Sequence, residues 1–574
     1  MPPSTPTVKD SWRFKLDPQA AIATGTRRAQ SGTTLTTQVA PPEHYYADNL
    51  QQLLAFVRWR FGAVLAPSTK LYIDRVEALP SDSLRLFARL LSRKGPVFRP
   101  GNLRYTEVAD LAAAIDGLIH SELLESSAAI SADTLLRSVR RSELAQWFPM
   151  VASMTKAAAL QVLVQRYSDA QIRAQLQRHM QWLTLPNRDQ YQMCLRLYFG
   201  DRHQDLSAFV IEDLGLMKYP TYPLSPPDWL TDQPQCLQQH ELLHHCAAFT
   251  HGLSRSQDQQ SLANALAQQL LVLPVSREQR QIKDRALLRI AAHLEQHGHL
   301  EQALASYAGT QRAPSRERQV RLLAKLGDAE GAEALLQNMR DEPLTAAEMD
   351  FAARHGKRHS AQHETTQLCL LGPTPKAIEA CAAELLVAQG GCAWHLENQL
   401  PLGIAGLLYW DVVFLELPGV FSRPFQLGPN DLFWPDFAEV RKTQLQALES
   451  QWQLDPQACL RQLWRTLETH QHTANLLVNW QVFDRHFVDE LTSRVPIQAL
   501  KKLGAFIIRE LGRFRSGFPD LLLSHADGSF EFVEVKGPKD QLQSNQRRWL
   551  KVLEELELPA RVVKLKADSS AHNQ

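Results

Sequence analysis

The fold of the C-terminal part of this chain is decided by the stretch GFPDLLLSHADGSFEFVEVKGP, residues 517–538. It contains two apolar runs separated by an Asp-Gly turn, which predicts a β-hairpin. Because side chains alternate along a strand, Phe532, Glu534 and Lys536 share one face of the second strand, and the two valines between them take the other. The hairpin therefore presents a carboxylate and an ammonium group side by side.

The length of the turn decides on which face Asp520 lies. A two-residue Asp-Gly loop would place Asp520 opposite Val535, on the wrong face for Glu534. A three-residue loop that ends in a left-handed Gly528 places it opposite Glu534. We predict the three-residue register or an equivalent bulge.

In that register two carboxylates and one ammonium group converge at an edge of the sheet. Neighbouring carboxylates repel each other, which favours a cation between them. We expect one or two Mg²⁺ or Mn²⁺ ions, held by Asp520 and Glu534, with the backbone carbonyl of Val535 completing the shell. Such a cation polarises a scissile phosphate and lowers the pKa of a bound water, while Lys536 orients that water and stabilises charge on phosphorus.

The helix expected after the hairpin carries a polar residue on its apolar side. Its apolar stripe consists of Leu542, Trp549, Leu550, Leu553 and Leu556, and Gln546 lies within it. A polar group on a buried face needs a hydrogen-bonding partner. We expect Gln546 to contact a water, a phosphate or a metal ligand at the site.

The whole chain has an ordinary globular composition. Its 574 residues suggest about three to five domains. Lys and Arg number 62 and Asp and Glu 61, a net charge of +1 that excludes a uniformly basic nucleic-acid coat but permits local patches. No apolar run is long enough to span a membrane, and the N-terminus lacks a basic-then-apolar signal pattern, so we do not expect secretion. The seven cysteines are scattered and never spaced Cys-x-x-Cys, which argues against disulfides and cysteine zinc fingers and favours a reducing cytoplasm.

Basic residues cluster in two N-terminal segments. Residues 85–104 carry six basic and no acidic residues, a charge of +6: Arg85, Arg89, Arg93, Lys94, Arg99 and Arg104. The first three recur every four residues and are expected on one helix face. That face either binds phosphates or is a solvated surface with acidic partners elsewhere. A second helical stretch, 131–165, is a weaker candidate for a DNA-binding module and carries Arg137, Arg140, Arg141 and Lys156.

Residues 236–360 are typical of antiparallel helix pairs. Gly298 and Gly327 lie in similar helix–turn–helix contexts 29 residues apart, which predicts a degenerate helical solenoid with an interaction surface. A basic stripe follows, interrupted by Glu317: Arg312, Arg316, Arg318, Arg321 and Lys325. His240 and His244 have a spacing that permits a metal site, but we favour plain histidines on a helix surface.

Several motifs resemble a known family. RSGFPD (515–520), EVKGP (534–538) and QRRW (546–549) resemble the virus-type replication-repair nuclease (VRR-NUC) domain, a branch of the PD-(D/E)xK nuclease fold. Other motifs resemble the Fanconi-anaemia-associated nuclease family: GLLYWD (406–411) with PGVF (418–421), and LLSRKG (90–95) followed by LRY (103–105). The resemblance covers residues 45–565.

The resemblance implies a fold and an activity. Members of the family are structure-selective DNA nucleases, phosphodiesterase I-type hydrolases that cut 5′ flaps and digest 5′ to 3′ with Mg²⁺ or Mn²⁺. They act in DNA repair, including interstrand crosslink repair. The implied fold is multidomain: mainly α-helical N-terminal and middle regions, with a SAP-like module and tetratricopeptide-like repeats, and a C-terminal α/β nuclease domain. We expect a disordered tail (1–41), a DNA-binding region (42–185), a repeat region (186–372), and the nuclease domain with a preceding helical segment (373–574).

The resemblance also implies particular residues and partners. By its position before the Trp-Asp motif, Glu397 is implied as a further metal ligand. DNA contacts are expected from the basic residues Arg85, Arg89, Arg93, Lys94, Arg104, Arg140 and Arg141. The partner is branched or flapped DNA, with no membrane. Larger relatives carry a ubiquitin-binding zinc finger; no cysteine precedes Cys194 here, so we expect none, and a bacterial-type, cytoplasmic and nucleoid-associated member.

Two alternatives remain at this point. The protein could be a Holliday-junction resolvase, as stand-alone domains of this nuclease type can be. It could also be a non-catalytic helical-repeat scaffold with a degenerate nuclease fold, which the intact set of Asp520, Glu534 and Lys536 argues against.

Overall fold

The computed structural model describes two units, which we treat separately. One consists of residues 1–218, 231–237 and 423–425, and the other of the remaining residues. The described residues run from 44 to 567 except 94, 96, 126–129, 201–205, 207–208, 210–211, 213–216, 254–256, 356–364, 371–377 and 388–390. The predicted tail, residues 1–41, lies outside this range.

The first unit begins with helices whose apolar stripes face one another. The helices are α3 (Tyr45–Phe61), α4 (Pro67–Glu77), α5 (Ser81–Leu91) and α6 (Leu111–His120), joined by α11 (Arg188–Phe199). Leu50, Leu53 and Val57 of α3 are completely buried, as the helical spacing predicts. Because α11 contacts α3, the predicted boundary between residues 185 and 186 falls inside this packed group.

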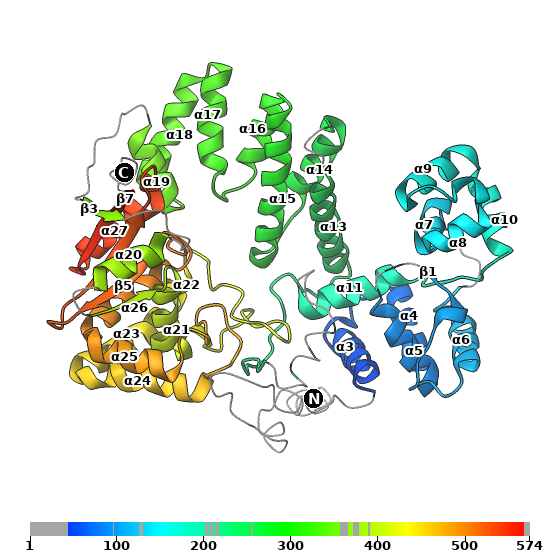
Figure 1. The fold of residues 1–574 in the computed structure, drawn as a ribbon, viewed down its shortest axis with the longest axis horizontal. Coiled ribbons are helices and arrows are strands. Elements are labelled where there is room, and N and C mark those ends of the chain that lie inside the picture. Colours follow the sequence, from blue (N-terminus) through cyan, green and yellow to red (C-terminus); the bar gives the residue numbers. More distant parts are fainter. Residues whose placement is uncertain are drawn as a thin grey trace, which may run out of the picture. The chain divides into compact units, whose positions relative to one another are not determined.

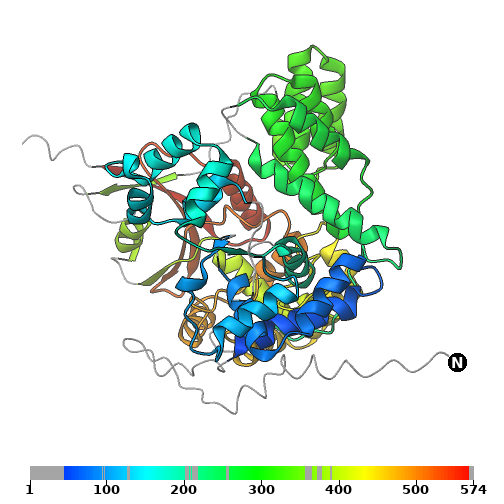
Figure 2. The same cartoon turned by 90° about the vertical axis from the view of Figure 1, so that its right-hand side faces the viewer.

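Residues 132–177 form a second small core in the same unit. It is built by α7 (Ala132–Ser138), α8 (Arg141–Trp147), α9 (Lys156–Arg166) and α10 (Asp169–Gln177). Three of these helices begin at residues whose hydroxyls accept backbone hydrogen bonds, namely Ser131, Thr155 and Ser168. A short antiparallel pair, β1 (Val97–Phe98) with β2 (Leu183–Thr184), joins chain segments far apart in the sequence. Figure 2 shows the blue helices α3–α6 and the cyan helices α7–α10 as two groups.

The second unit opens with helical hairpins. They comprise α13 (Gln235–Phe249), α14 (Gln260–Val272), α15 (Arg277–Gln296), α16 (Leu300–Ala308), α17 (Ser315–Leu326), α18 (Ala329–Asp341) and α19 (Ala346–Arg354). Gly298 and Gly327 lie between paired helices, both with φ of +86°, a conformation that favours glycine. The predicted helix pairs are confirmed, and Figure 1 shows α13–α18 side by side in a row.

A five-stranded mixed sheet forms the centre of the C-terminal part. Its order is β3-β7-β6-β5-β4, from β3 (Thr365–Leu370), β4 (Gly391–His395), β5 (Leu521–His525), β6 (Phe530–Lys536) and β7 (Ala560–Ala567). β3 and β6 run parallel to β7, whereas β4–β5 and β5–β6 are antiparallel. The C-terminal α/β fold is therefore confirmed.

Both faces of this sheet are covered by helices. Leu521, Val533 and Val535 face α20 (Ile378–Val387), while Leu522 and Phe532 join a larger core on the other face. That core includes residues of α21 (Gln399–Val413), α22 (Phe437–Val440), α23 (Lys442–Leu454), α24 (Pro456–His470), α25 (Arg485–Arg494), α26 (Ile497–Glu510) and α27 (Ser544–Glu555). Strands β3 and β4 were not predicted, and β3 lies before the predicted domain boundary at residue 373.

Two further expectations concern membranes and cysteines. Among the described residues, no helix combines the length and apolarity needed to cross a membrane. Of the cysteines whose side chains the structure describes, six are free thiols, five of them buried.

Candidate active site

The β5–β6 hairpin has the predicted three-residue register. Leu521 pairs with Val533 and Leu522 with Phe532, which places Asp520 opposite Glu534. The His525 amide donates a hydrogen bond to the Ser529 carbonyl at 2.8 Å, closing a loop of three residues. Gly528 in that loop has a φ of +83°. The register prediction is confirmed, including its left-handed glycine.

The position of the hairpin within the sheet differs from the prediction. Asp520 and Glu534 were expected at a sheet edge, but β6 lies between β7 and β5, and β5 lies between β6 and β4. The charged groups therefore meet at the ends of interior strands. As a result Glu534 is only 1% exposed and Lys536 has a side-chain exposure of 12%.

The two oxygens of Glu534 have different surroundings. Its Oε1 atom accepts hydrogen bonds from Lys536 Nζ at 2.7 Å and from Gln546 Nε2 at 2.6 Å. Its Oε2 atom is buried and has no hydrogen-bond partner among the described residues. Asp520 is fixed through Oδ2, which accepts from the Val535 amide at 2.8 Å. Each carboxylate thus has one oxygen held by the protein, and Glu534 Oε2 remains available to a ligand.

Gln546, although it lies in an apolar stripe, has hydrogen-bond partners for its side chain. It lies in the first turn of α27, where its Oε1 atom accepts from the Gln543 amide at 2.9 Å. Its Nε2 atom donates to Glu534. Trp549, one turn later, is completely buried among Phe506, Phe514 and Phe518, which fixes the helix beside the sheet.

The electrostatics of Glu534 and Asp520 favour a bound cation. Burial, and then repulsion from Asp520, raise the pKa of Glu534 to about 7 despite the opposing effect of Lys536. Burial also raises the pKa of Asp520, although the Val535 amide lowers it. A divalent cation would relieve both effects, and the unpartnered Oε2 atom of Glu534 is a suitable oxygen ligand for it. The residues present therefore fit a divalent metal cofactor.

Glu397 approaches the same place from β4. It lies in the turn between β4 and α21, with a φ of +44°, and not within a helix. The amides of Leu396 and Glu397 donate to the Asp520 carbonyl at 3.1 and 3.3 Å. These contacts hold the turn against the start of β5, so the structure brings Glu397 together with Asp520, as the family resemblance implied.

His395 is a residue that the sequence analysis missed. Its Nε2 atom lies 3.1 Å from Glu397 Oε1. Candidate ligand atoms of His395, Glu397 and Asp520 all lie within 4.8 Å of one another. The available signal was the pair of residues His395 and Glu397, two apart and directly before a helix, but without β4 nothing indicated that they meet Asp520.

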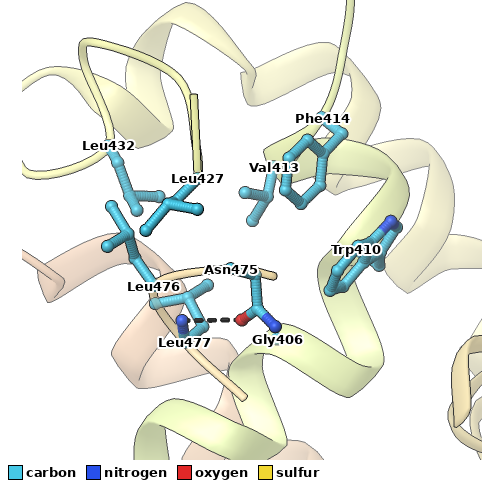
Figure 3. A pocket seen from close by; sticks show the side chains of 9 residues that line it. All are labelled: Gly406, Trp410, Val413, Phe414, Leu427, Leu432, Asn475, Leu476 and Leu477. Atoms are coloured by element: carbon cyan, nitrogen blue, oxygen red, sulfur yellow. Dashed lines mark hydrogen bonds between the residues drawn. The ribbon is translucent and has the colours of Figure 1, made fainter. Parts of the chain in front are cut away.

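The Trp-Asp motif supports this site from a distance. Trp410 lies in the core, with its ring 4.6 Å from that of His470, and Asp411 forms an ion pair with Arg465. An apolar pocket lies beside this part of α21 (Figure 3); its lining residues are Gly406, Trp410, Val413, Phe414, Leu427, Leu432, Asn475, Leu476 and Leu477. Since none of these side chains titrates, the pocket has no groups for phosphate chemistry. The motif therefore anchors the helix that follows Glu397.

Several of the N-terminal basic residues form ion pairs with acidic residues that lie outside the basic segment 85–104. Arg85 contacts Asp82 at 3.1 Å and Arg89 contacts Glu107 at 2.8 Å, so both have acidic partners just outside residues 85–104. Arg93 does not share their helix, because α5 ends at Leu91. The expectation that all three arginines share a helix face is therefore wrong for Arg93, while Arg85 and Arg89 have the acidic partners of the alternative interpretation.

The other four described members of the expected DNA-binding set have other environments, and one member is not described. Arg93 lies over the Tyr105 ring at 5.1 Å, and Arg104 donates to the Leu103 carbonyl. Arg141 donates to the carbonyls of Met154 and Ala152. Arg140 is the residue directly before α8. Lys94 lies outside the described residues.

In the repeat region, charged and polar side chains also find protein partners. Arg316 pairs with Glu348 and Arg318 with Glu295. His240 and His244 were expected on a helix surface but are buried, with exposures of 5% and 7%. His240 lies 3.0 Å from Gln279 and stacks on Trp229, which identifies it as a core residue.

Comparisons with known proteins agree with this geometry. The VRR-NUC domain family matches residues 454–567, and the family described as FAN1, HTH domain matches residues 44–125. A Fanconi-associated nuclease 1 homolog from Pseudomonas aeruginosa is 27% identical over 93% of this chain and 98% of its own length. Human Fanconi-associated nuclease 1 is 31% identical over 28% of this chain and 16% of its own length.

A solved structure shares the fold of nearly the whole chain. The crystal structure of paFAN1 bound to 5′-flap DNA with a gap superposes with a TM-score of 0.81 at 24% identity, covering 93% of this chain and all of that one. Residues 454–567, which carry Asp520, Glu534 and Lys536, match the VRR-NUC domain family. Along most of its length the chain is similar to Fanconi-associated nuclease 1 homologs, and residues 44–125 match the FAN1, HTH domain family.

Proposed function

We propose that this protein is a divalent-metal-dependent DNA nuclease that cuts 5′ flaps and digests DNA from 5′ to 3′ in DNA repair, including repair of interstrand crosslinks. The observation that carries this proposal is the convergence of Asp520, Glu534 and Lys536 at the ends of β5 and β6. The similarity to Fanconi-associated nucleases supports it, as does the flapped DNA in the paFAN1 structure. We expect Mg²⁺ or Mn²⁺ as the cofactor because the offered ligands are mainly carboxylate oxygens.

Each residue of the site has a distinct task in this proposal. The Val535 amide and Gln546 hold Asp520 and Glu534, so that one oxygen of each carboxylate is directed to a cation. A cation bound there would supply Lewis-acid polarisation of the phosphate and would lower the pKa of a bound water. Lys536 is held 2.7 Å from Glu534, and its ammonium group stabilises the negative charge that develops on the phosphate.

The substrate is proposed to be recognised by shape. The chain's net charge of +1 predicts weak binding to plain duplex, and DNA backbone contacts spread over separate basic patches favour a bent or branched form. The match of residues 44–125 to the FAN1, HTH domain family supports a DNA-binding role for the N-terminal unit.

The test is cleavage of 5′-flap DNA labelled at its 5′ end, with Mn²⁺ and with Mg²⁺. We expect Asp520→Asn and Lys536→Ala to lower the cleavage rate by at least roughly 10³-fold and 10²-fold respectively. DNA affinity, measured by fluorescence anisotropy, should remain close to that of the unchanged protein. Asp527→Asn is the matched control, because Asp527 lies in the turn of the same hairpin and only caps Ser529.

The outcomes separate the other possible functions. Cleavage by Asp520→Asn at the unchanged rate would refute the assignment. Failure of the unchanged protein to cut flaps with either metal would favour a scaffold. Faster cleavage of four-way junctions than of 5′ flaps, together with a dimer on DNA in sizing experiments, would favour a Holliday-junction resolvase.

A further inference from the structure

His395 stands at the end of an edge strand, beside the two carboxylates that the DNA cleavage proposal uses. β4 and β5 are antiparallel, and His395 pairs with Leu521, the residue after Asp520. The left-handed backbone at Glu397 breaks the strand directly afterwards. His395, Glu397 and Asp520 therefore direct their ends to one place, where their ligand atoms lie within 4.8 Å of one another.

These distances suit direct coordination. Around a cation with bonds of about 2.1 Å, adjacent ligand atoms lie about 3 Å apart and opposite ones about 4.2 Å apart. His395 Nε2 and Glu397 Oε1 are 3.1 Å apart, which fits adjacent ligands. Both side chains are about half exposed, so their pairing alone would contribute little to stability.

A second observation concerns Glu534, which is not one of these three residues but lies opposite Asp520 in the hairpin. Glu534 is 99% buried, yet its Oε2 atom has no hydrogen-bond partner in the described part of the chain. Its other oxygen is already held by Lys536 and Gln546. An unpaired buried carboxylate oxygen costs free energy. A cation that Glu534 shares with Asp520 would pair this oxygen, whereas exposed, solvated charges would not.

We propose that His395 is a direct metal ligand, so that the site offers an imidazole nitrogen together with the carboxylates of Glu397 and Asp520. This inference rests on the proposed function, because it concerns the same cation site. Mg²⁺ prefers oxygen ligands, whereas first-row transition ions also accept imidazole. The nitrogen ligand therefore gives the site a preference for Mn²⁺ over Mg²⁺ that an all-carboxylate site would lack.

The test measures the metal itself, without DNA. Mn²⁺ is bound to the full chain and examined by electron spin-echo modulation spectroscopy, with and without ¹⁵N-labelled histidine. We expect a directly bound nitrogen whose signal changes on labelling and disappears in His395→Ala. In calorimetric titrations, that variant should bind Mn²⁺ roughly tenfold or more weakly, while Mg²⁺ affinity changes less than about threefold.

His525→Ala is the matched control. His525 also lies beside a carboxylate of the same sheet, 2.9 Å from Glu531, but at the other end of β5. It should leave the nitrogen signal and the Mn²⁺ affinity unchanged. If His395 only oriented Glu397, Mn²⁺ in the unchanged protein would show no directly bound nitrogen, and the inference would be overturned.

Failure of this inference can be told apart from failure of the proposed function. Cleavage of 5′ flaps by a protein whose Mn²⁺ lacks a nitrogen ligand would remove His395 from the site and leave the nuclease. A histidine-bound Mn²⁺ in a protein that cuts no flap would support the ligand and contradict the nuclease.

Discussion

The strand-end site and helix α5 use charge in opposite ways. At the site, Glu534 is buried with one oxygen unpartnered and a pKa raised to about 7. On α5, Arg85 and Arg89 each contact a carboxylate within about 3 Å. The site therefore retains an unsatisfied charge for a ligand, while the helix face has satisfied much of its charge internally.

The difference shows why a local charge count misleads. Residues 85–104 contain no acid, but Asp82 and Glu107 lie just outside that window and pair with its arginines. The carboxylates of the site come from segments more than 120 residues apart, and no window would have joined Glu397 to Asp520. Free charge is recognised from pairing in space and from burial.

The largest effect is expected from Glu534→Gln, which removes the negative charge of the side chain and keeps its size and shape. Cleavage should fall on the order of 10³-fold. At high pH the stability of the variant should rise. The pKa of Glu534 is raised from 4.5 to about 7, so this group stabilises the fold below about pH 4.5 and loses the contribution as pH rises through 7. The free energy lost is about 3 kcal/mol.

Denaturant unfolding in EDTA at pH 5 and pH 8 measures this effect. The variant should be more stable than the unchanged protein at pH 8 and nearly equal to it at low pH. Added Mn²⁺ should stabilise the unchanged protein and have a smaller effect on the variant. A variant that loses stability at pH 8 without metal would show that Lys536 already satisfies the buried carboxylate.

An intermediate effect is expected at Gln546, which joins the site to α27. Gln546→Ala should lower cleavage roughly 10- to 100-fold, because it removes a hydrogen bond that orients a metal ligand. Loss of the contact to the Gln543 amide should cost about 1 kcal/mol of stability. Gln546→Glu separates the two roles, since it can still accept from Gln543 but cannot donate to Glu534. Flap cleavage at the unchanged rate by Gln546→Ala would contradict the orienting role.

The smallest effects are expected from the basic residues of the first unit, where substitutions should separate DNA-contacting arginines from arginines that only stabilise the fold. Arg93 and Arg104 form no ion pair among the described residues, so we expect the double variant Arg93→Ala, Arg104→Ala to lower the salt dependence of DNA binding by about one unit of slope per lost phosphate contact. The matched variant Arg85→Ala, Arg89→Ala should leave that slope unchanged and cost about 1 kcal/mol of stability. If the salt dependence of DNA binding changes more in the second variant, the α5 face with Arg85 and Arg89 is the DNA contact.

The hairpin and its register could be predicted because local chemistry specified them. A three-residue turn places Asp520 opposite Glu534, whereas a two-residue turn would not, and Gly528 is suited to the three-residue turn. The position of the polar Gln546 in an apolar stripe likewise predicted a partner, which proved to be Glu534. In both cases the deciding residues lie within about 30 positions of one another.

The rest of the site depends on distant pairing. β4, GCAWH, is short and lacks regular alternation, and it becomes a strand through its contact with β5, 130 residues later. Without β4, neither the interior position of β5 nor the role of His395 could be recognised. The acidic partners of the arginines were missed for the same physical reason, since side chains on separate elements meet only after folding.

The side chain of Gln546 joins the amide of Gln543 at one end to Glu534 at the other. The first turn of α27 and the strand-end carboxylate are therefore held by a single amide group, and opening one loosens the other. Deuterium uptake at the Gln543 amide consequently reports on the occupancy of the site: a ligand that steadies Glu534 slows exchange at a backbone position it does not touch.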